Sequence, residues 1–186
     1  MTHLVASPFA HTSGPRSASI ALVGEAWGDQ EEAFGRPFVG TSGQELTRML
    51  AEAGIERKDV FLTNVFALKP YENKVEHLCA SRDETGGTSH PFPPLVAKGK
   101  FLRQEYWPEI ERLKAELDEV KPNIVVALGN TASWALLRST KISSIRGAIA
   151  TSTLCPGLKV LPTYHPAGVM RNWAWRTIVV ADLMKA

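Results

Sequence analysis

The sequence predicts a three-layer α/β/α sandwich with a mainly parallel, four-stranded central sheet. Short apolar runs alternate along the chain with longer segments whose apolar residues recur at helical spacing. One run, residues 124–128 (IVVAL), is apolar throughout, which is typical of a strand covered on both faces. Strands that alternate with helices favour parallel pairing, with helices on both sides of the sheet.

Each expected element has a local signal. The expected strands are residues 20–23 (IALV), 60–65 (VFLTNV), 124–128 and 160–162. The expected helices are residues 42–53, 103–120, 129–137 and 173–184. The first of these helices opens with a serine cap, and Gly54 ends it. In residues 103–120 the apolar positions share one face, so we expect the charged residues to form a solvated face.

The length and composition fit a single domain over residues 1–186. The chain is 44% hydrophobic, enough for one compact core. We expect the polar residues 1–18 to be a flexible tail. Residues 71–99, rich in Pro, Gly and Ser, are expected to be a loop insertion. No apolar run approaches the roughly 20 residues that span a bilayer, so we expect no membrane contact.

Charge and cysteine content limit the classes of partner and cofactor. The net charge is only +2, so binding to nucleic acid would need a local basic patch. The two cysteines, Cys79 and Cys155, indicate a reducing compartment, and we expect a cytoplasmic monomer. Two thiols cannot complete a cluster that needs four thiolates.

The residues that follow the predicted strands are the candidates for function, because ligands of such sheets bind beyond the carboxyl ends of the strands. The first strand is followed by an acidic, glycine-containing loop. Its glycines allow close backbone approach to a ligand, and its carboxylates supply acceptors or a base. An acidic loop that caps a helix is the alternative. The candidate residues here are Gly24, Glu25, Ala26, Gly28, Asp29 and Glu31.

Phe38 and Asn64 are the next candidates. Phe38 stands between Pro37 and Gly40 in a loop, where an aromatic ring can stack on a planar ligand. It could equally staple the following helix. Asn64 ends a predicted strand, and its amide offers an adjacent donor and acceptor that can read a pyrimidine edge. The alternative is that its amide satisfies a turn.

His165 follows the last predicted strand and precedes Pro166, which restricts the backbone beside the imidazole ring. A lone histidine is often structural. Because this one follows a strand end, we weigh a catalytic role and a structural role equally. Met170 and Arg171 close this segment.

Together these segments resemble the uracil-DNA glycosylase superfamily, and within it the branch of thermophilic and bacterial iron–sulfur enzymes. The matching runs occur in the order of the family and span roughly residues 20–171. They are GEAWGDQEEAFGRPFVGTSGQEL, DVFLTNVFALKP, NIVVALGNTA and VLPTYHPAGVMR.

The resemblance implies hydrolysis of the N-glycosidic bond of a flipped-out uracil in DNA, as in base-excision repair. It implies backbone contacts to uracil from Gly24, Ala26 and Gly28, stacking by Phe38, discrimination against cytosine by Asn64, a hydrogen bond from His165 to uracil O2, and DNA contacts from Pro166, Met170 and Arg171. The group that positions the attacking water stays open among Glu25, Asp29 and Glu31.

The chain departs from the family pattern at several places. Trp27 stands where the first motif usually has proline, and the cysteines that bind the cluster are missing. We therefore expect no iron–sulfur cluster and no other cofactor. One alternative is a non-catalytic or tight-binding reader of uracil or a modified base in DNA. Another is a small-molecule enzyme that acts on nucleosides or sugar phosphates. His77 leaves a covalent uracil binder open as well.

Overall fold

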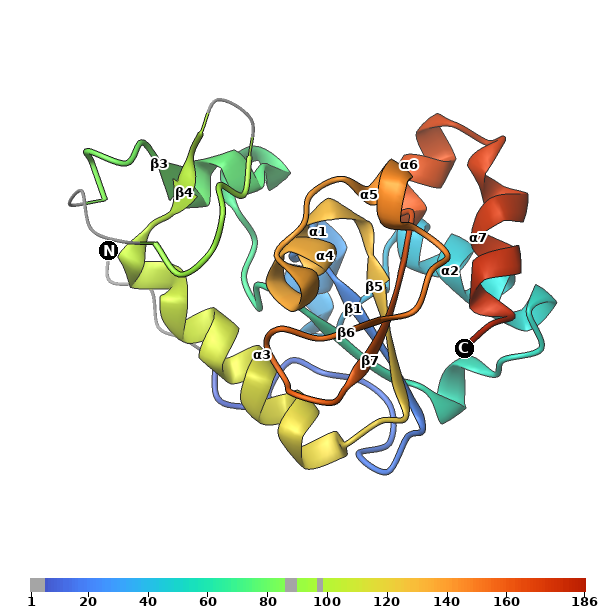
Figure 1. Ribbon diagram of the computed structural model, residues 1–186. Helices are drawn as coiled ribbons and strands as arrows, with labels where there is room; N and C mark the ends of the chain where they lie inside the picture. Colours follow the sequence, from blue (N-terminus) through green and yellow to red (C-terminus); the bar gives the residue numbers. More distant parts are fainter. Residues whose placement is uncertain (1–5, 86–89, 97–98) are drawn as a thin grey trace.

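The central sheet has five strands in the order β2-β1-β5-β7-β6, rather than the four expected (Figure 1). The computed structural model describes residues 6–85, 90–96 and 99–186. The strands of this sheet are β1 (Ile20–Gly24), β2 (Phe61–Asn64), β5 (Ile124–Leu128), β6 (Ala150–Thr151) and β7 (Lys159–Thr163). The first four strands of the spatial order run parallel, and β6 pairs antiparallel with β7. The prediction of a mainly parallel α/β sandwich is confirmed.

The predicted long helices are present, with small shifts at their ends. The α-helices are α1 (Asp29–Phe34), α2 (Thr41–Glu52), α3 (Trp107–Val120), α4 (Gly129–Leu137), α5 (Ile142–Ile145), α6 (Pro166–Arg171) and α7 (Trp175–Leu183). Four short 3₁₀ helices are also described: η1 (Arg57–Asp59), η2 (Tyr71–Asn73), η3 (Val75–Leu78) and η4 (Gln104–Tyr106).

Helices cover both faces of the sheet, which creates two apolar cores (Figure 1). Successive residues of a strand point to opposite faces. Val23 of β1 accordingly packs in the cluster of Trp134, on the side of α3 and α4. Its neighbour Leu22 packs with Met49 of α2 and Val179 of α7 on the other side. The apolar character of the central strands is thus explained by burial on both faces.

The segment expected to be a loop insertion has some regular structure of its own. Besides η2 and η3 it contains β3 (Cys79–Ala80), which pairs antiparallel with β4 (Phe101–Leu102). The ring of Phe92 contacts Trp134, with a centroid distance of 4.7 Å. The part of the insertion in residues 86–89 and 97–98 lies outside the described residues.

The N-terminal stretch from residue 6 onward packs on the domain and is not the flexible tail that we expected. Ser13 forms a β-bridge with Leu62 on the outer edge of β2. The ring of Phe9 lies edge-on to Phe61 at a centroid distance of 5.9 Å. The remainder of the expected tail, residues 1–5, falls outside the described residues. None of the described helices is long and apolar enough to cross a membrane.

Candidate active site

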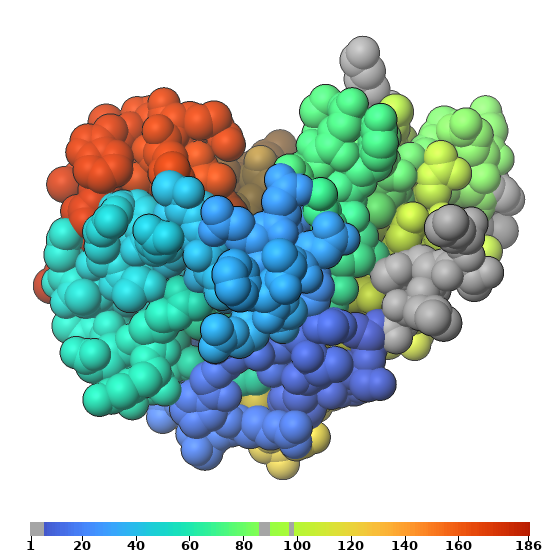
Figure 2. Space-filling model, turned by 180° about the vertical axis from the view of Figure 1, so that it is seen from behind, coloured from blue at the N-terminus to red at the C-terminus, as the bar shows by residue number. Residues whose placement is uncertain are grey.

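The carboxyl ends of the four parallel strands meet at one edge of the sheet. This register places Gly24 beside Asn64, and it places the segments that follow β5 and β7 next to each other. Figure 2 shows the surface hollowed at the top of the view, between the C-terminal segment (red) and the segment near residue 70 (green). The loops named from the sequence therefore converge on this edge.

Gly24 is the point where Phe38 and Asn64 come together. A Cβ atom built on Gly24 would lie 2.3 Å from Asn64 Oδ1 and 2.5 Å from Phe38 Cζ. No larger residue fits there without displacing both side chains. Asn64 and Phe38 are almost completely buried, with 4% and 5% of their surface exposed. The ring of Phe38 also faces His165, at a centroid distance of 6.4 Å and an interplanar angle of 31°.

The loop that carries Phe38 is held in an unusual conformation. Phe38 has a φ of +55°, a left-handed conformation that costs free energy for a bulky residue. Glu31 offsets this cost, because its Oε1 accepts the N–H groups of Val39 at 2.9 Å and Gly40 at 2.8 Å. Arg57 donates to the carbonyl of Pro37, the residue before Phe38, at 3.2 Å. Polar contacts therefore hold the backbone before and after Phe38, which fixes the position of its ring.

His165 caps the start of α6. Its Nδ1 accepts a hydrogen bond from the N–H of Ala167 at 3.1 Å, which places the proton of the neutral ring on Nε2. Burial, together with the positive charge of Arg171, lowers the pKa of His165 to about 4. The neutral ring is thus the stable form near pH 7, and it presents one N–H donor. Gly129 makes room for the start of the His165 side chain, because a Cβ atom there would lie 2.9 Å from His165 Cβ.

Glu25 is the mostly buried carboxylate that follows β1. Burial raises its pKa, and a hydrogen bond from the hydroxyl of Thr131 opposes that rise. The positive charge of Arg171 also lowers this pKa, so Arg171 lies within electrostatic reach of both Glu25 and His165.

The other two candidate carboxylates have different surroundings. Both oxygens of Glu31 are used by backbone N–H groups, since Oε2 also accepts from Gly28 at 3.2 Å. Asp29 is exposed and forms an ion pair with Lys69. The hydrogen bond and charge of Lys69 lower the pKa of Asp29. Glu31 therefore joins two loops, and Asp29 faces solvent.

The segment after His165 presents exposed side chains. Pro166 is buried at the first position of α6, whereas Met170 and Arg171 are exposed at its end. Trp173 follows with 62% of its surface exposed. A large apolar ring that solvent reaches this freely is a candidate contact for another molecule.

Trp27 and Ala26 complete the loop after β1. Ala26 packs against the core on the α3 side. The indole ring of Trp27 lies edge-on to His11 at a centroid distance of 4.5 Å. It also lines a hollow of about 430 Å³, together with residues that follow β2, such as Leu68 and Tyr71. The residue that replaces the usual proline therefore packs on the N-terminal segment.

The cysteines do not suit a metal cluster. Both are buried, and burial raises the pKa of Cys79 to about 12 and that of Cys155 to about 11. Two thiols cannot supply the four thiolates that an iron–sulfur cluster needs. Within the described residues, no group of three or more His, Cys, Asp or Glu side chains could hold a metal ion.

Sequence reasoning missed the residues that hold the site together. Thr131 lies in the quoted run NIVVALGNTA, yet only the structure brings its hydroxyl to Glu25. Arg57 had no signal in the sequence, because it acts across 20 residues of chain on the carbonyl of Pro37. A single sequence offers no clue to contacts of this range.

The fold and the site define the class of protein. The family model of the uracil DNA glycosylase superfamily matches residues 11–183, and the chain belongs to this superfamily. It is similar to the type-4 uracil-DNA glycosylase of Thermotoga maritima, with 33% identity over 93% of this chain and 78% of the relative. It is also similar to the type-4 uracil-DNA glycosylases of Archaeoglobus fulgidus (32% identity over 92% of this chain and 77% of the relative) and Saccharolobus solfataricus (29% over 92% and 71%).

Proposed function

We propose that this chain is a monofunctional DNA glycosylase that hydrolyses the N-glycosidic bond of uracil in DNA and leaves an abasic site. The observation that carries the proposal is the convergence of three side chains: Phe38 and Asn64 meet at Gly24, and the ring of Phe38 faces that of His165. A stacking ring, an amide and an imidazole donor are what a single flipped-out pyrimidine requires. The names of the type-4 relatives support the same activity.

The protein recognises the base by stacking on the face of its ring and by hydrogen bonds to its edge. Phe38 supplies a flat surface for the uracil ring, a contact worth about 1–3 kcal/mol per base. Asn64 donates its amide N–H to uracil O4 and accepts from N3–H. Cytosine presents the opposite pattern, so it leaves both groups unpaired unless the amide flips. Discrimination therefore depends on how firmly Asn64 is held.

The leaving group is stabilised by donors aimed at uracil O2. When the bond between C1′ and N1 breaks, its electron pair goes to uracil. A preorganised donor at such an oxygen is worth about 3–4 kcal/mol. His165 supplies Nε2–H as a neutral donor. In the loop after β1, the N–H groups of Trp27 and Gly28 already bond to Leu68 and Glu31, so the backbone donor we assign to the base is that of Ala26.

Glu25 is the carboxylate that we assign to the water. The sugar carries positive charge in the transition state, and a nearby carboxylate stabilises it and orients the nucleophile. Water attacks C1′, and Glu25 accepts its proton. Glu31 has no free oxygen for this role, and Asp29 is held by Lys69 in solvent. Glu25 is partly buried and held by Thr131.

DNA contacts outside the base fall to the exposed end of α6. Met170 and Arg171 are placed to enter the groove beside the expelled nucleotide, and Pro166 sets the direction of the helix. Arg171 would neutralise phosphate charge, which makes binding sensitive to salt.

We propose that the reaction needs no iron–sulfur cluster or other cofactor, because two protonated, buried thiols cannot supply four thiolates. We also propose that residues 1–186 form a single domain that acts as a monomer in the cytoplasm. Free buried thiols fit such a reducing compartment. The amount of iron in the purified protein and its sedimentation test these points.

The deciding experiment is a release assay. Oligonucleotides that contain uracil, hypoxanthine, xanthine or thymine, in single and double strands, are incubated with the protein and cleaved with alkali. We expect nicking at uracil, and slowing by orders of magnitude for His165→Ala and for Asn64→Ala. A gel shift without nicking would instead support the reader. Near-normal release by both folded variants would refute the assigned site.

A further inference from the structure

Helix α3 turns three charged side chains toward the sheet, where we expected a solvated face. Glu109, Arg112 and Glu116 are spaced by three and four residues and are all buried; Arg112 is only 4% exposed. Arg112 Nε donates to Glu109 Oε2 at 2.8 Å, and Nη1 donates to Glu116 Oε1 at 2.7 Å. Buried charges are rare unless paired. These three pair with one another, and they also have partners on the sheet.

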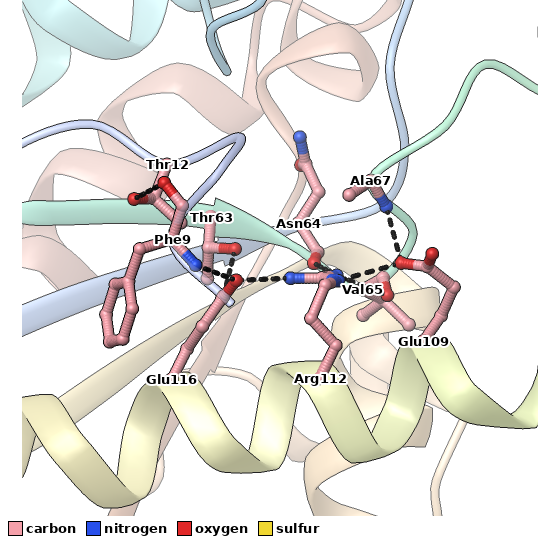
Figure 3. Close-up of polar contacts among 9 residues, drawn as sticks. All are labelled: Phe9, Thr12, Thr63, Asn64, Val65, Ala67, Glu109, Arg112 and Glu116. Carbon is pink, nitrogen blue, oxygen red and sulfur yellow. Dashed lines mark hydrogen bonds and ion pairs between the residues drawn. The ribbon is translucent and has the colours of Figure 1, made fainter. Parts of the chain in front are cut away.

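The partners on the sheet lie at the end of β2 (Figure 3). Arg112 Nη2 donates to the main-chain carbonyls of Asn64 at 2.8 Å and Val65 at 3.0 Å. Glu116 Oε2 accepts from the hydroxyl of Thr63 at 2.7 Å. Glu109 Oε2 accepts from the N–H of Ala67 at 2.9 Å. The cluster therefore holds the main chain from Asn64 to Ala67, and before Asn64 it holds the side chain of Thr63.

The opposite side of this segment is tied to the loop after β1. The N–H of Val65 donates to the carbonyl of Gly24 at 3.0 Å, and that of Phe66 donates to the carbonyl of Glu25 at 3.0 Å. The main chain at Asn64 thus lies between this loop and α3. In Figure 3 the side chain of Asn64 points away from the cluster, and it reaches the neighbourhood of Gly24.

The end of β2 needs such support because β2 is an edge strand of the sheet. In the described part of the chain, its outer side is bridged only at Leu62, by Ser13. A strand end with one partner is loosely held, whereas an amide that reads a base must keep its position and orientation.

We propose that Arg112 is a positioning residue for base recognition: by gripping the carbonyls of Asn64 and Val65, it fixes the direction of the Asn64 amide toward uracil. This inference rests on the proposed function. Arginine suits the task because its planar fork serves two carboxylates and two carbonyls at once. The single ammonium of lysine cannot reproduce that geometry.

The test is a double-mutant cycle on uracil release under single-turnover conditions. The variants are Arg112→Lys, Asn64→Ala and the combination of both. If Arg112 acts through Asn64, Arg112→Lys alone slows release by about tenfold to a hundredfold, since misplacement of a contact group by about 1 Å costs this much. The combined variant then releases uracil no more slowly than Asn64→Ala alone.

Arg176→Lys is the matched control. Arg176 also forks between two carboxylates, Glu45 and Glu52, which join α7 to α2. Its guanidinium also lies over the ring of Trp173, and none of these contacts involves β2. We expect it to release uracil at the rate of the wild-type protein and to lose only thermal stability.

Two results would overturn the inference: a combined variant slowed by the product of the two single effects, or a folded Arg112→Lys variant with the wild-type rate. If Arg112→Lys fails to fold, Thr63→Val takes its place in the cycle, because it removes only the hydroxyl that Glu116 holds. A wild-type protein that releases no uracil would refute the proposed function instead, so the two failures are distinguishable.

Discussion

Changing His165 to asparagine separates the roles of the two ring nitrogens. Asparagine Oδ1 takes a place similar to that of Nδ1, so it can still accept from the N–H of Ala167 and cap α6. It lacks the distal N–H that we assign to uracil O2. We therefore expect the fold to survive and uracil release to slow by about 10²- to 10³-fold, the cost of losing one such donor.

The same variant tests the charge state of the ring through stability. The unfolded chain protonates His165 near 6.5, whereas burial holds the folded pKa at about 4. Between these values the unfolded state binds more protons, so acid favours unfolding. The free energy of unfolding of the wild-type protein therefore decreases as the pH falls from 6.5 to about 4, and this difference between the two pKa values corresponds to roughly 3 kcal/mol. Above pH 6.5 the effect of His165 on stability does not change with pH.

Urea denaturation of both proteins, at several values between about pH 7 and pH 4, measures the effect. Other groups titrate equally in the two proteins, so their contributions cancel in the difference. We expect the stability of the wild-type protein, relative to His165→Asn, to fall by roughly 3 kcal/mol across this range. Parallel curves would show that the folded ring takes up a proton normally, and the argument for a neutral donor would fail.

Three other perturbations address the rest of the site. Gly24→Ala places a methyl group 2.3 Å from Asn64 Oδ1 and 2.5 Å from Phe38 Cζ, so we expect release to fall at least about a hundredfold with secondary structure retained by circular dichroism. Release by the wild-type protein should decline in acid as Glu25 takes up a proton, at a pH above 4.5 because burial raises its pKa. Glu25→Gln should be slower throughout and lack that decline, and an unchanged profile would exclude Glu25. Arg171→Ala should reduce the slope of log affinity against log salt by about one for an uncleavable duplex; an equal slope would remove Arg171 from the DNA contacts.

The elements with strong periodicity could be predicted from the sequence, and those stabilised by tertiary contacts could not. The strand at 124–128 coincides with β5 because five consecutive apolar residues leave little choice. Strand β6 was missed because its two residues, Ala150 and Thr151, are exposed and carry no pattern. The N-terminal segment looked unstructured, and it is ordered through contacts such as that of Phe9 with Phe61.

The residues that form the site were easier to predict than the role of each one. The strand-end rule predicts that Phe38, Asn64 and His165 lie at one edge. In the structure Phe38 and Asn64 meet at Gly24, and His165 faces the ring of Phe38. That rule could not separate Glu25 from Glu31, because the two differ in partners that only the fold brings to them: the hydroxyl of Thr131 for Glu25, and backbone N–H groups for Glu31. Arg112 was hidden for a related reason: a charged residue on an amphipathic helix is usually solvated, and only the position of α3 on the sheet shows otherwise.

The packing of residues 6–18 along β2 has a practical consequence for handling the protein. Ser13 occupies hydrogen-bonding positions of Leu62 that would otherwise be open on the rim of the sheet. A bare rim is a template for strand addition by a second molecule. A version trimmed to begin at residue 19 should therefore be prone to self-association. The trimmed protein would also lack the N–H of Phe9, which donates a hydrogen bond to Glu116. Because Glu116 binds Arg112 and Thr63, shortening the chain at this end would disturb the support of Asn64 and hence uracil recognition.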